Sequence, residues 1–403
     1  MRSLLNIKNI RKALAAALVI VLCAAPACVF AAGKPGLGFM KSGPSFESEA
    51  LEVTESSNTS NSAESLKADY SNATEITVSD SESDVKIKDS GTYIVTGSCL
   101  DGNITVKKGT AGVVLVLKDL DLTSKTGAAL LINKGAEVKI IVSGKVTLTD
   151  AEDIEDEDSE GYDGAAIKIK AGASVVLSGD GALTLNGNCE HGIKVSDASF
   201  IIDGELPINI TGVEDGINSG ADVTIKSGTI NISAGADGIK SDYILTIGSD
   251  GSAGPVINVE ESSEGLEGAI VNIYSGTINV NAKDDAINAA NSELSGYTFS
   301  INIMGGEISL SSDADGLDSN GNINILGGHT TILKSASDGG GEGGVDYEGR
   351  CYVAEGCLTN PYGVTFDSGT GGKSDKAPEP QQKTRSFGDL INRILNFFRN
   401  LFR

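Results

Sequence analysis

The chain has 403 residues, with 55 acidic and 31 basic side chains, 51 glycines, nine tyrosines, ten phenylalanines and no tryptophan. This composition excludes a core built around large aromatic side chains, so the interior must consist of small aliphatic residues. The formal net charge of −24 argues against a protein that follows nucleic-acid phosphates and favours cations as partners.

The first 32 residues have the pattern of a secretory signal peptide. Basic residues between Arg2 and Lys12 precede an apolar run over 13–25, which is too short to span a bilayer. A small-residue cleavage site follows at 29–31. We therefore expect a secreted or extracellular protein, with association at the cell surface as a further option.

Two polar segments flank the body of the chain. Residues 33–75 are rich in Ser, Glu, Asn and Thr, and residues 367–385 are similarly polar, so both are predicted to be flexible linkers. Residues 33–372 hold 20 basic and 52 acidic side chains, a formal charge of −32. A bound divalent cation would offset part of the resulting self-repulsion.

The body, residues 76–366, repeats a turn of the form acid-Asp-Gly followed by Ile or Leu. Successive turns are 28, 24, 22, 27, 21, 30 and 23 residues apart, an average of 25. Three short strands with tight corners fill such a period, which is typical of a parallel β-helix, whereas the pattern of leucine-rich repeats is absent. Recurrent triplets such as Ile230-Asn231-Ile232 place two aliphatic side chains inside and Asn outside. The sequence therefore predicts an all-β solenoid.

Four cysteines remain after removal of the signal peptide. Cys351 and Cys357 are close enough for a local disulfide, and Cys99 and Cys189 would pair only if the fold stacks them. Buried free thiols are the alternative.

The acidic corners predict a site for a divalent cation. Calcium takes six to eight oxygen ligands, and strands of adjacent coils lie about 4.8 Å apart, so equivalent acids would repel one another unless an ion bridges them. The alternative is that Asp-Gly serves only as turn chemistry. The acidic run over 150–163 is predicted to be a loop, either solvated or a second cation site.

The order of motifs also resembles a known family. The segments GTYIVTGSCLDGNITV, EDGINSGADVTIKSGTINI and ADGLDSNGNINILGG resemble the clostridial-type secreted carbohydrate-binding proteins, which have a right-handed parallel β-helix similar in fold to pectate lyases. The resemblance implies binding of calcium and of acidic sugars such as polygalacturonate, and also of cellulose. The residues that it implies as calcium ligands are Glu214, Asp215, Asp237, Glu264, Asp284, Asp285, Asp315 and Asp318. His191 and Ala286 depart from the repeated pattern.

These features favour a non-catalytic, calcium-dependent binder of acidic plant cell-wall polysaccharide. Without tryptophan a flat aromatic platform is not expected, and an acidic glycan would be repelled unless calcium accepted its carboxylates. One alternative is a pectate-lyase-like enzyme, but Arg350 is the single arginine between residues 12 and 385, and a lyase would need an Arg or Lys base. Another is a structural stalk or adhesin without a specific glycan.

Residues 386–403 are predicted to form an amphipathic helix. Four phenylalanines lie on its apolar face, opposite Arg393, Arg399 and Arg403. Such a helix is typical of contact with a membrane surface or a partner, and a cap on the open end of the solenoid is the alternative.

Overall fold

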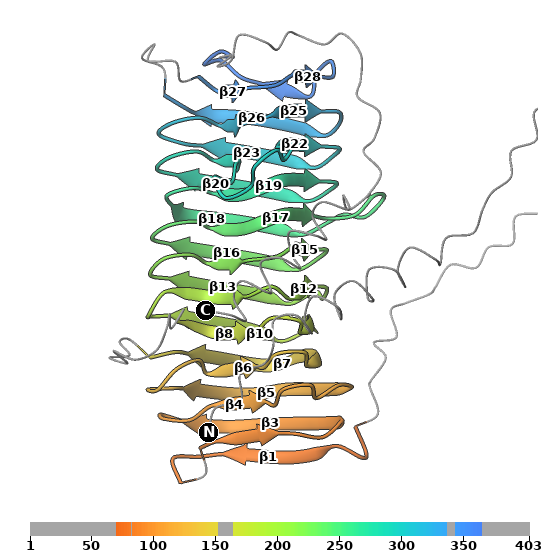
Figure 1. The fold of residues 1–403 in the computed structure, drawn as a ribbon, viewed down its shortest axis with the longest axis vertical. Coiled ribbons are helices and arrows are strands. Elements are labelled where there is room, and N and C mark those ends of the chain that lie inside the picture. Colours follow the sequence, from red (N-terminus) through yellow and green to blue (C-terminus); the bar gives the residue numbers. More distant parts are fainter. Residues whose placement is uncertain (1–69, 82, 152–163, 337–342, 365–403) are drawn as a thin grey trace, which may run out of the picture. The chain divides into compact units, whose positions relative to one another are not determined.

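A computed structural model describes residues 70–81, 83–151, 164–336 and 343–364. These residues form a parallel β-solenoid of about ten turns and contain no helix (Figure 1). The predicted all-β solenoid is therefore confirmed. The predicted signal peptide, the C-terminal linker and helix, and nearly all of the N-terminal linker lie outside the described residues. No helix in the described part of the chain could cross a membrane.

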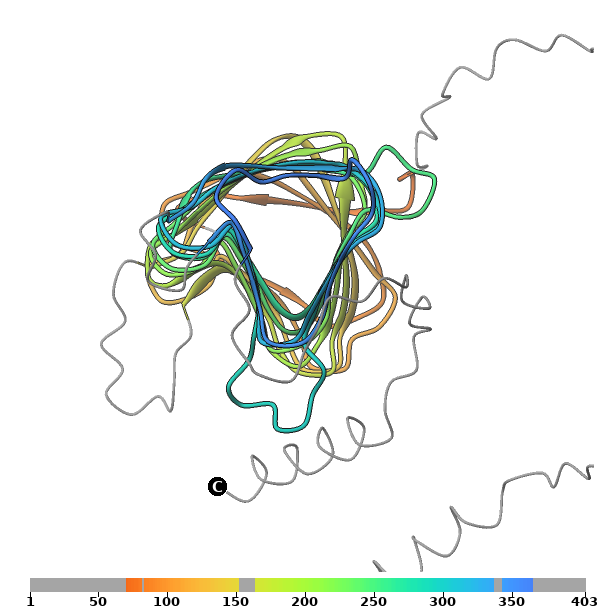
Figure 2. The ribbon, with the colours of Figure 1, turned by 90° about the horizontal axis from the view of Figure 1, so that it is seen from above.

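Each coil contributes strands to three parallel faces, which appear as the three sides of a triangle in Figure 2. Face A contains β2 (Val85–Ile87), β4 (Ile104–Val106), β6 (Leu130–Ile132), β8 (Ala165–Ile169), β11 (His191–Val195), β14 (Ile217–Ser219), the first parts of β17 (Ile239–Ile247) and β19 (Leu266–Ile273), β21 (Ile287–Ala289), β24 (Leu317–Ser319) and β27 (Val345–Tyr347).

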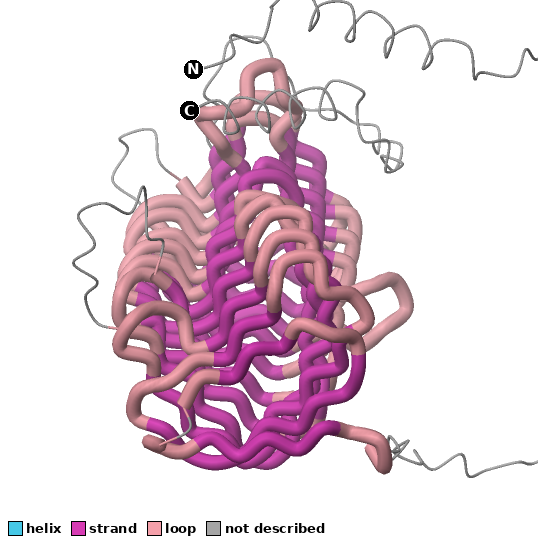
Figure 3. The backbone as a smooth tube through the Cα atoms, turned by 60° about the horizontal axis from the view of Figure 1, so that its bottom comes forward, coloured by secondary structure: helices cyan, strands magenta, loops and turns pink. Residues whose placement is uncertain are grey.

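Faces B and C complete each coil. Face B contains β1 (Thr74–Val78), the first parts of β3 (Gly91–Cys99), β5 (Val113–Thr123) and β7 (Glu137–Thr149), then β9 (Ser174–Gly179), β12 (Ser199–Ile202), β15 (Val223–Ile225), the second parts of β17 and β19, β22 (Ser300–Ile303), β25 (Asn322–Ile325) and β28 (Cys351–Val353). Face C contains the last parts of β3, β5 and β7, then β10 (Ala182–Gly187), β13 (Pro207–Gly212), β16 (Thr229–Ala234), β18 (Val256–Ser262), β20 (Thr277–Ala282), β23 (Glu307–Ser311), β26 (His329–Lys334) and β29 (Leu358–Thr359). Figure 3 shows these strands with the loops that join them.

The core is a continuous aliphatic column. In β16, Ile230 and Ile232 are buried while Asn231 points outward, as the alternation predicts. Ile230 pairs in register with Ile208 on one neighbouring coil and with Ile257 on the other. Each coil therefore completes the apolar contacts of the next, which no single coil could do alone.

Outward asparagines form ladders along the stack. On face C the Asn231 amide donates to Asn209 Oδ1 at 2.9 Å, and Asn258 donates to Asn231 Oδ1 at 2.8 Å. Face B has a similar ladder, in which Asn302 donates to Asn272 and Asn324 donates to Asn302. These bonds satisfy the amides between coils and hold the register of the strands.

The Asp-Gly corners stack where face C ends and face A begins. The N–H of each residue after a corner residue donates to the corner carbonyl of the next coil, for example Gly216 to Asp237 at 2.9 Å. A Cβ on Gly216 would lie 2.6 Å from the Gly238 carbonyl oxygen and 2.4 Å from an Ile232 methyl carbon. This glycine is therefore needed for close stacking of the corners. We call His191, Asp215, Asp237, Glu264, Asp285 and Asp315 the corner column.

No disulfide joins the four cysteines that lie in the described part of the chain. Cys99 is buried, as the alternative of buried thiols predicts, whereas Cys189, Cys351 and Cys357 are partly exposed, so that alternative holds for Cys99 alone. Cys351 lies in β28 on face B, paired with Ile323, whereas Cys357 lies in the turn before β29. The solenoid thus assigns these two cysteines to different elements instead of one hairpin.

Candidate metal site

Several corner carboxylates accept hydrogen bonds from backbone N–H groups of the next coil. Asp215 Oδ1 accepts a hydrogen bond from the Asp237 N–H at 2.8 Å, and Asp285 Oδ1 accepts one from Asp315 at 2.9 Å. Asp315 Oδ1 accepts one from Gly343 at 2.7 Å. These acids therefore hold adjacent corners together. An Asp in a turn commonly accepts a hydrogen bond from nearby backbone, and here the acceptor and the donor lie on neighbouring coils.

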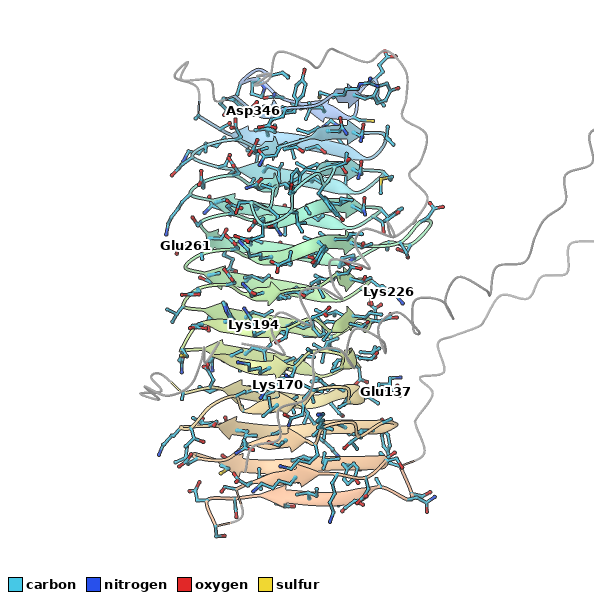
Figure 4. All side chains as sticks on the ribbon, in the orientation of Figure 1. Glu137, Lys170, Lys194, Lys226, Glu261 and Asp346 are labelled. Carbon is cyan, nitrogen blue, oxygen red and sulfur yellow. The ribbon has the colours of Figure 1, made fainter. Side chains whose placement is uncertain are left out.

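A second column runs beside the corner column on face A. Strand pairing aligns the residues that lie three positions after the members of the corner column. It extends this row to Lys168 on the coil before and to Asp346 on the coil after, and we call this set the face A column. Its members, in chain order, are Lys168, Lys194, Asn218, Lys240, Glu267, Asn288, Asp318 and Asp346. Lysines lie toward the N-terminal coils and acids toward the C-terminal coils, as Lys194 and Asp346 in Figure 4 illustrate.

Asp237, Glu264 and Glu267 form one acidic cluster, in which one oxygen of each lies within 4.8 Å of the others. The Lys240 ammonium lies among them, 2.9 Å from Asp237 Oδ2 and hydrogen-bonded to Glu267. Burial raises the pKa of Glu267 to about 8, with a further rise from a hydrogen bond shared with Asp237. Burial opposes the charge of Lys240, but its bonds to the two carboxylates outweigh this and raise its pKa. The protein therefore supplies its own cation to this cluster.

A second acidic cluster lies in the C-terminal coils and surrounds a pocket of about 240 Å³, which we call the acid pocket. It is lined by Asp284, Asp285, Asp315, Asp318 and Asp346, together with Ala314, Asn320, Tyr347 and Glu348. Burial raises the pKa of Asp318 to about 7, and the charges of Asp285, Asp346, Asp315 and Glu264 add to the rise. Among the described residues that line this pocket, none is a lysine or arginine, in contrast to the cluster around Lys240.

Unpaired oxygens beside the acid pocket show that the donor set suits a hard cation. Asn288 is 7% exposed and lies between Glu267 and Asp318 in the face A column. Its buried Oδ1 has no hydrogen-bond partner among the described residues, and neither has Glu264 Oε2. Burial and the charge of Asp237 raise the pKa of Glu264 to about 7, although a hydrogen bond with Asn288 opposes the rise. Calcium prefers such an all-oxygen set of carboxylates and amide carbonyls.

The structure distributes the eight predicted ligands over three places. Asp284, Asp285, Asp315 and Asp318 line the acid pocket. Glu264 is adjacent through Asn288, and it also belongs to the cluster with Asp237. The third place is around His191, where Asp215 Oδ2 lies 3.3 Å from Nδ1 and Glu214 groups with Glu190 and His191.

Sequence reasoning missed three members of these clusters, namely Glu267, Asn288 and Asp346. All three occupy the face A column, and Glu267 and Asn288 lie three positions after Glu264 and Asp285. Comparing that position between repeats would have revealed Glu267 and Asn288, because outward strand residues of successive coils align. Asp346 is identified only by its strand pairing with Asp318.

The acidic run over 150–163 is described only in part, since residues 152–163 lie outside the described residues. Asp150 is 1% exposed, and its Oδ1 accepts the Asn188 N–H at 2.6 Å. Burial raises its pKa to about 6. The first residue of the acidic run, Asp150, is thus a buried part of the fold.

Comparison with known proteins gives the class of the protein. A family described as carbohydrate-binding domain-containing protein matches residues 81–339, so the chain belongs to this family. A relative with the same description from Acetivibrio thermocellus is 35% identical over 131 residues, which are 32% of this chain and 46% of the relative. The match thus spans less than half of that relative. Its description names a binding domain and not an enzyme.

A solved structure is also similar. It is titled as the polysaccharide lyase-like protein from C. thermocellum, gadolinium derivative, and is 26% identical. The match covers 70% of this chain and 98% of that chain, with a TM-score of 0.41.

Proposed function

We propose that this protein is a secreted, non-catalytic binder of acidic polysaccharide such as polygalacturonate, and that it acts through calcium held in the acid pocket. The observation that carries the proposal is the convergence of Asp285, Asp315, Asp318 and Asp346 on one pocket, beside the unpaired Oδ1 of Asn288. Carboxylates this close cannot all be charged without a compensating cation or proton.

The chain's own residues determine how such a site would work. Asp285 and Asp315 are oriented by backbone N–H groups of the following coil, so their carboxylates are positioned before any ion arrives. Asp318 and Asp346 project from adjacent strands, β24 and β27. Bound calcium would supply coordination positions for the carboxylates of a glycan. This would overcome the repulsion between an acidic glycan and a body of charge −32.

The pocket favours binding over bond cleavage. A lyase removes a proton with an Arg or Lys base, and the described residues that line the acid pocket include neither. Tyr347 is only 4% exposed, so it does not offer a platform on which a sugar ring could stack.

The proposal is tested by electrophoresis of the full chain through a gel containing polygalacturonate, with calcium and with a chelator. We expect retardation only with calcium and no unsaturated product. Asp318→Asn should abolish the retardation, whereas Asp121→Asn, an exposed acid on β5, should preserve it. Retardation that survives chelation would contradict the proposal, product formation would identify a lyase, and no interaction would favour a stalk.

Face C supports a second candidate ligand, a neutral glycan such as cellulose. One outward column on this face contains only uncharged residues from Thr147 to Thr359. Hydroxyl and amide groups at a regular spacing suit the hydroxyls of an uncharged chain. Sedimentation with cellulose in the presence of a chelator tests this candidate. Binding should persist there and weaken in Asn231→Asp, which places a charge in the column.

A further inference from the structure

One coil of the corner column carries a histidine where the following coils carry acids. His191 is 3% exposed and occupies the position that Asp215 occupies on the next coil. One ligand atom from each of Glu190, His191 and Glu214 lies within 4.8 Å of the other two. His191 Nε2 is 3.6 Å from Glu190 Oε2. The cluster therefore combines an imidazole with two carboxylates.

Asp215, the next member of the corner column, contacts the Nδ1 side of the His191 ring. The ring Nδ1 accepts a hydrogen bond from the Asp215 backbone N–H at 3.3 Å, and it also lies 3.3 Å from Asp215 Oδ2. A histidine that binds a metal through one ring nitrogen commonly directs the other at a carboxylate, which fixes the ring and its tautomer. Metal binding through Nε2 would require the ring proton on Nδ1, where Asp215 Oδ2, 3.3 Å away, could accept it.

The donor set differs in kind from that of the acid pocket. One imidazole nitrogen and two carboxylates suit zinc and similar first-row dications, whereas calcium takes oxygen ligands. Zinc–ligand distances of about 2.1 Å place ligands of a tetrahedral site about 3.4 Å apart. The 3.6 Å between His191 and Glu190 is close to this value, and Glu214 is exposed, so its side chain can adjust.

A nearby buried acid adds to the negative potential of this corner. Asp150 is 1% exposed, and its Oδ2 has no hydrogen-bond partner among the described residues. Burial raises the pKa of Asp150, and the charge of Glu190 adds a smaller rise. A dication bound by Glu190 would stabilise both.

We propose that Glu190, His191 and Glu214 form a site for a first-row transition-metal dication of the zinc class, with Asp215 as the residue that positions the imidazole. Five coil steps separate His191 from Asp315, which corresponds to about 24 Å. The site is therefore separate from the acid pocket, and it does not depend on the function proposed above. Glu214 is exposed to solvent.

The chain offers a sharp test because it contains two histidines, His191 and His329. Zinc and cobalt(II) are titrated into the full chain in the presence of saturating calcium. Titration calorimetry measures the heat of binding, and visible absorption detects bound cobalt. His191→Asp restores the residue type of the neighbouring corners and should lower zinc affinity at least about 100-fold and remove the cobalt spectrum. Glu214→Gln and Asp215→Asn should each lower it about 10- to 100-fold.

Two controls keep the result interpretable. His329→Asn and Glu137→Gln should leave zinc affinity unchanged, since both side chains lie in other parts of the solenoid. His191→Asp should retain calcium-dependent binding of polygalacturonate, so failure of this site and failure of the proposed function are distinguishable. Absence of zinc binding by the unaltered chain, or equal binding by His191→Asp, would overturn the proposal, and loss of binding in His329→Asn would do so as well.

Discussion

Asp318→Asn should have opposite effects on stability with and without calcium. The carboxyl of Asp318 has a pKa of about 7 in the folded protein because it is buried among like charges, compared with an ordinary value of 3.8. A folded-state pKa that is raised above the unfolded value means that the folded state holds its proton more tightly. Stability therefore falls as pH rises from about 4 to about 7.

The size of this effect follows from the two pKa values. The rise from 3.8 to about 7 corresponds to about 4 kcal/mol of destabilisation above pH 7, as an upper bound. Asn removes the charge while keeping nearly the same shape. Without calcium at pH 8, we therefore expect Asp318→Asn to be more stable than the unaltered protein by up to about 4 kcal/mol, and at pH 4 we expect little difference.

Calcium should reverse this order. An ion that binds only the folded state stabilises it in proportion to the logarithm of its concentration relative to the dissociation constant. The unaltered protein should gain from calcium and Asp318→Asn should gain little. Urea unfolding followed by circular dichroism, at pH 4 and pH 8 with chelator or calcium, measures all four cases. Midpoints are compared, because long repeat arrays do not always unfold in one step.

Asp121→Asn provides the matched control, since it removes one exposed acid far along the solenoid from the acid pocket. It should change stability by no more than about 0.5 kcal/mol under any of these conditions. If Asp318→Asn is less stable than the unaltered protein in chelator at pH 8, the claim that repulsion dominates the pocket is wrong. If both proteins respond equally to calcium, the acid pocket is not the calcium site.

Three further predictions concern other parts of the solenoid. At pH 7, calcium should displace about one proton, because the two carboxyls with pKa values of about 7 are each half protonated; calorimetry in buffers of different ionisation enthalpy measures this. Gly216→Ala should cost about 2 kcal/mol through overpacking, whereas Gly220→Ala, whose Cβ would meet nothing closer than 3.6 Å, should be nearly neutral in urea unfolding. Lys240→Met should lower the free energy of unfolding by about 2 kcal/mol in chelator, because it leaves two carboxylates without their ammonium partner. It should also add one calcium to the stoichiometry found by titration. Lys226→Met, which removes an exposed ion pair, should have neither effect.

Much of the fold was predictable because the sequence repeats at the scale of one coil. Alternation around Ile230 and Ile232 identified the interior, and the spacing of the Asp-Gly turns identified a solenoid. Stacked corners follow from that period, so the common column of Asp285 and Asp315 could be anticipated. These features depend on short-range patterns that strand pairing then repeats.

The composition of the site was less predictable because it depends on which residues face each other across coils. Coils differ in length, and an insertion such as the loop between β21 and β22 separates residues that pair in space. Asn288 and Asp318 are 30 residues apart yet adjacent on face A. Only pairing shows that Lys240 lies within one acidic cluster, whereas the described residues that line the acid pocket include no lysine or arginine. The need for glycine at position 216 also follows from close packing between coils.

The face A column has an uneven distribution of charge along the solenoid axis. Ammonium groups such as that of Lys194 stand toward one end, and carboxylates such as that of Asp346 stand toward the other. A negatively charged chain lying along this face would meet attraction at one end and repulsion at the other. Raising the salt concentration would then weaken the first contact and relieve the second, so the two ends of one bound strand would respond to ionic strength with opposite signs.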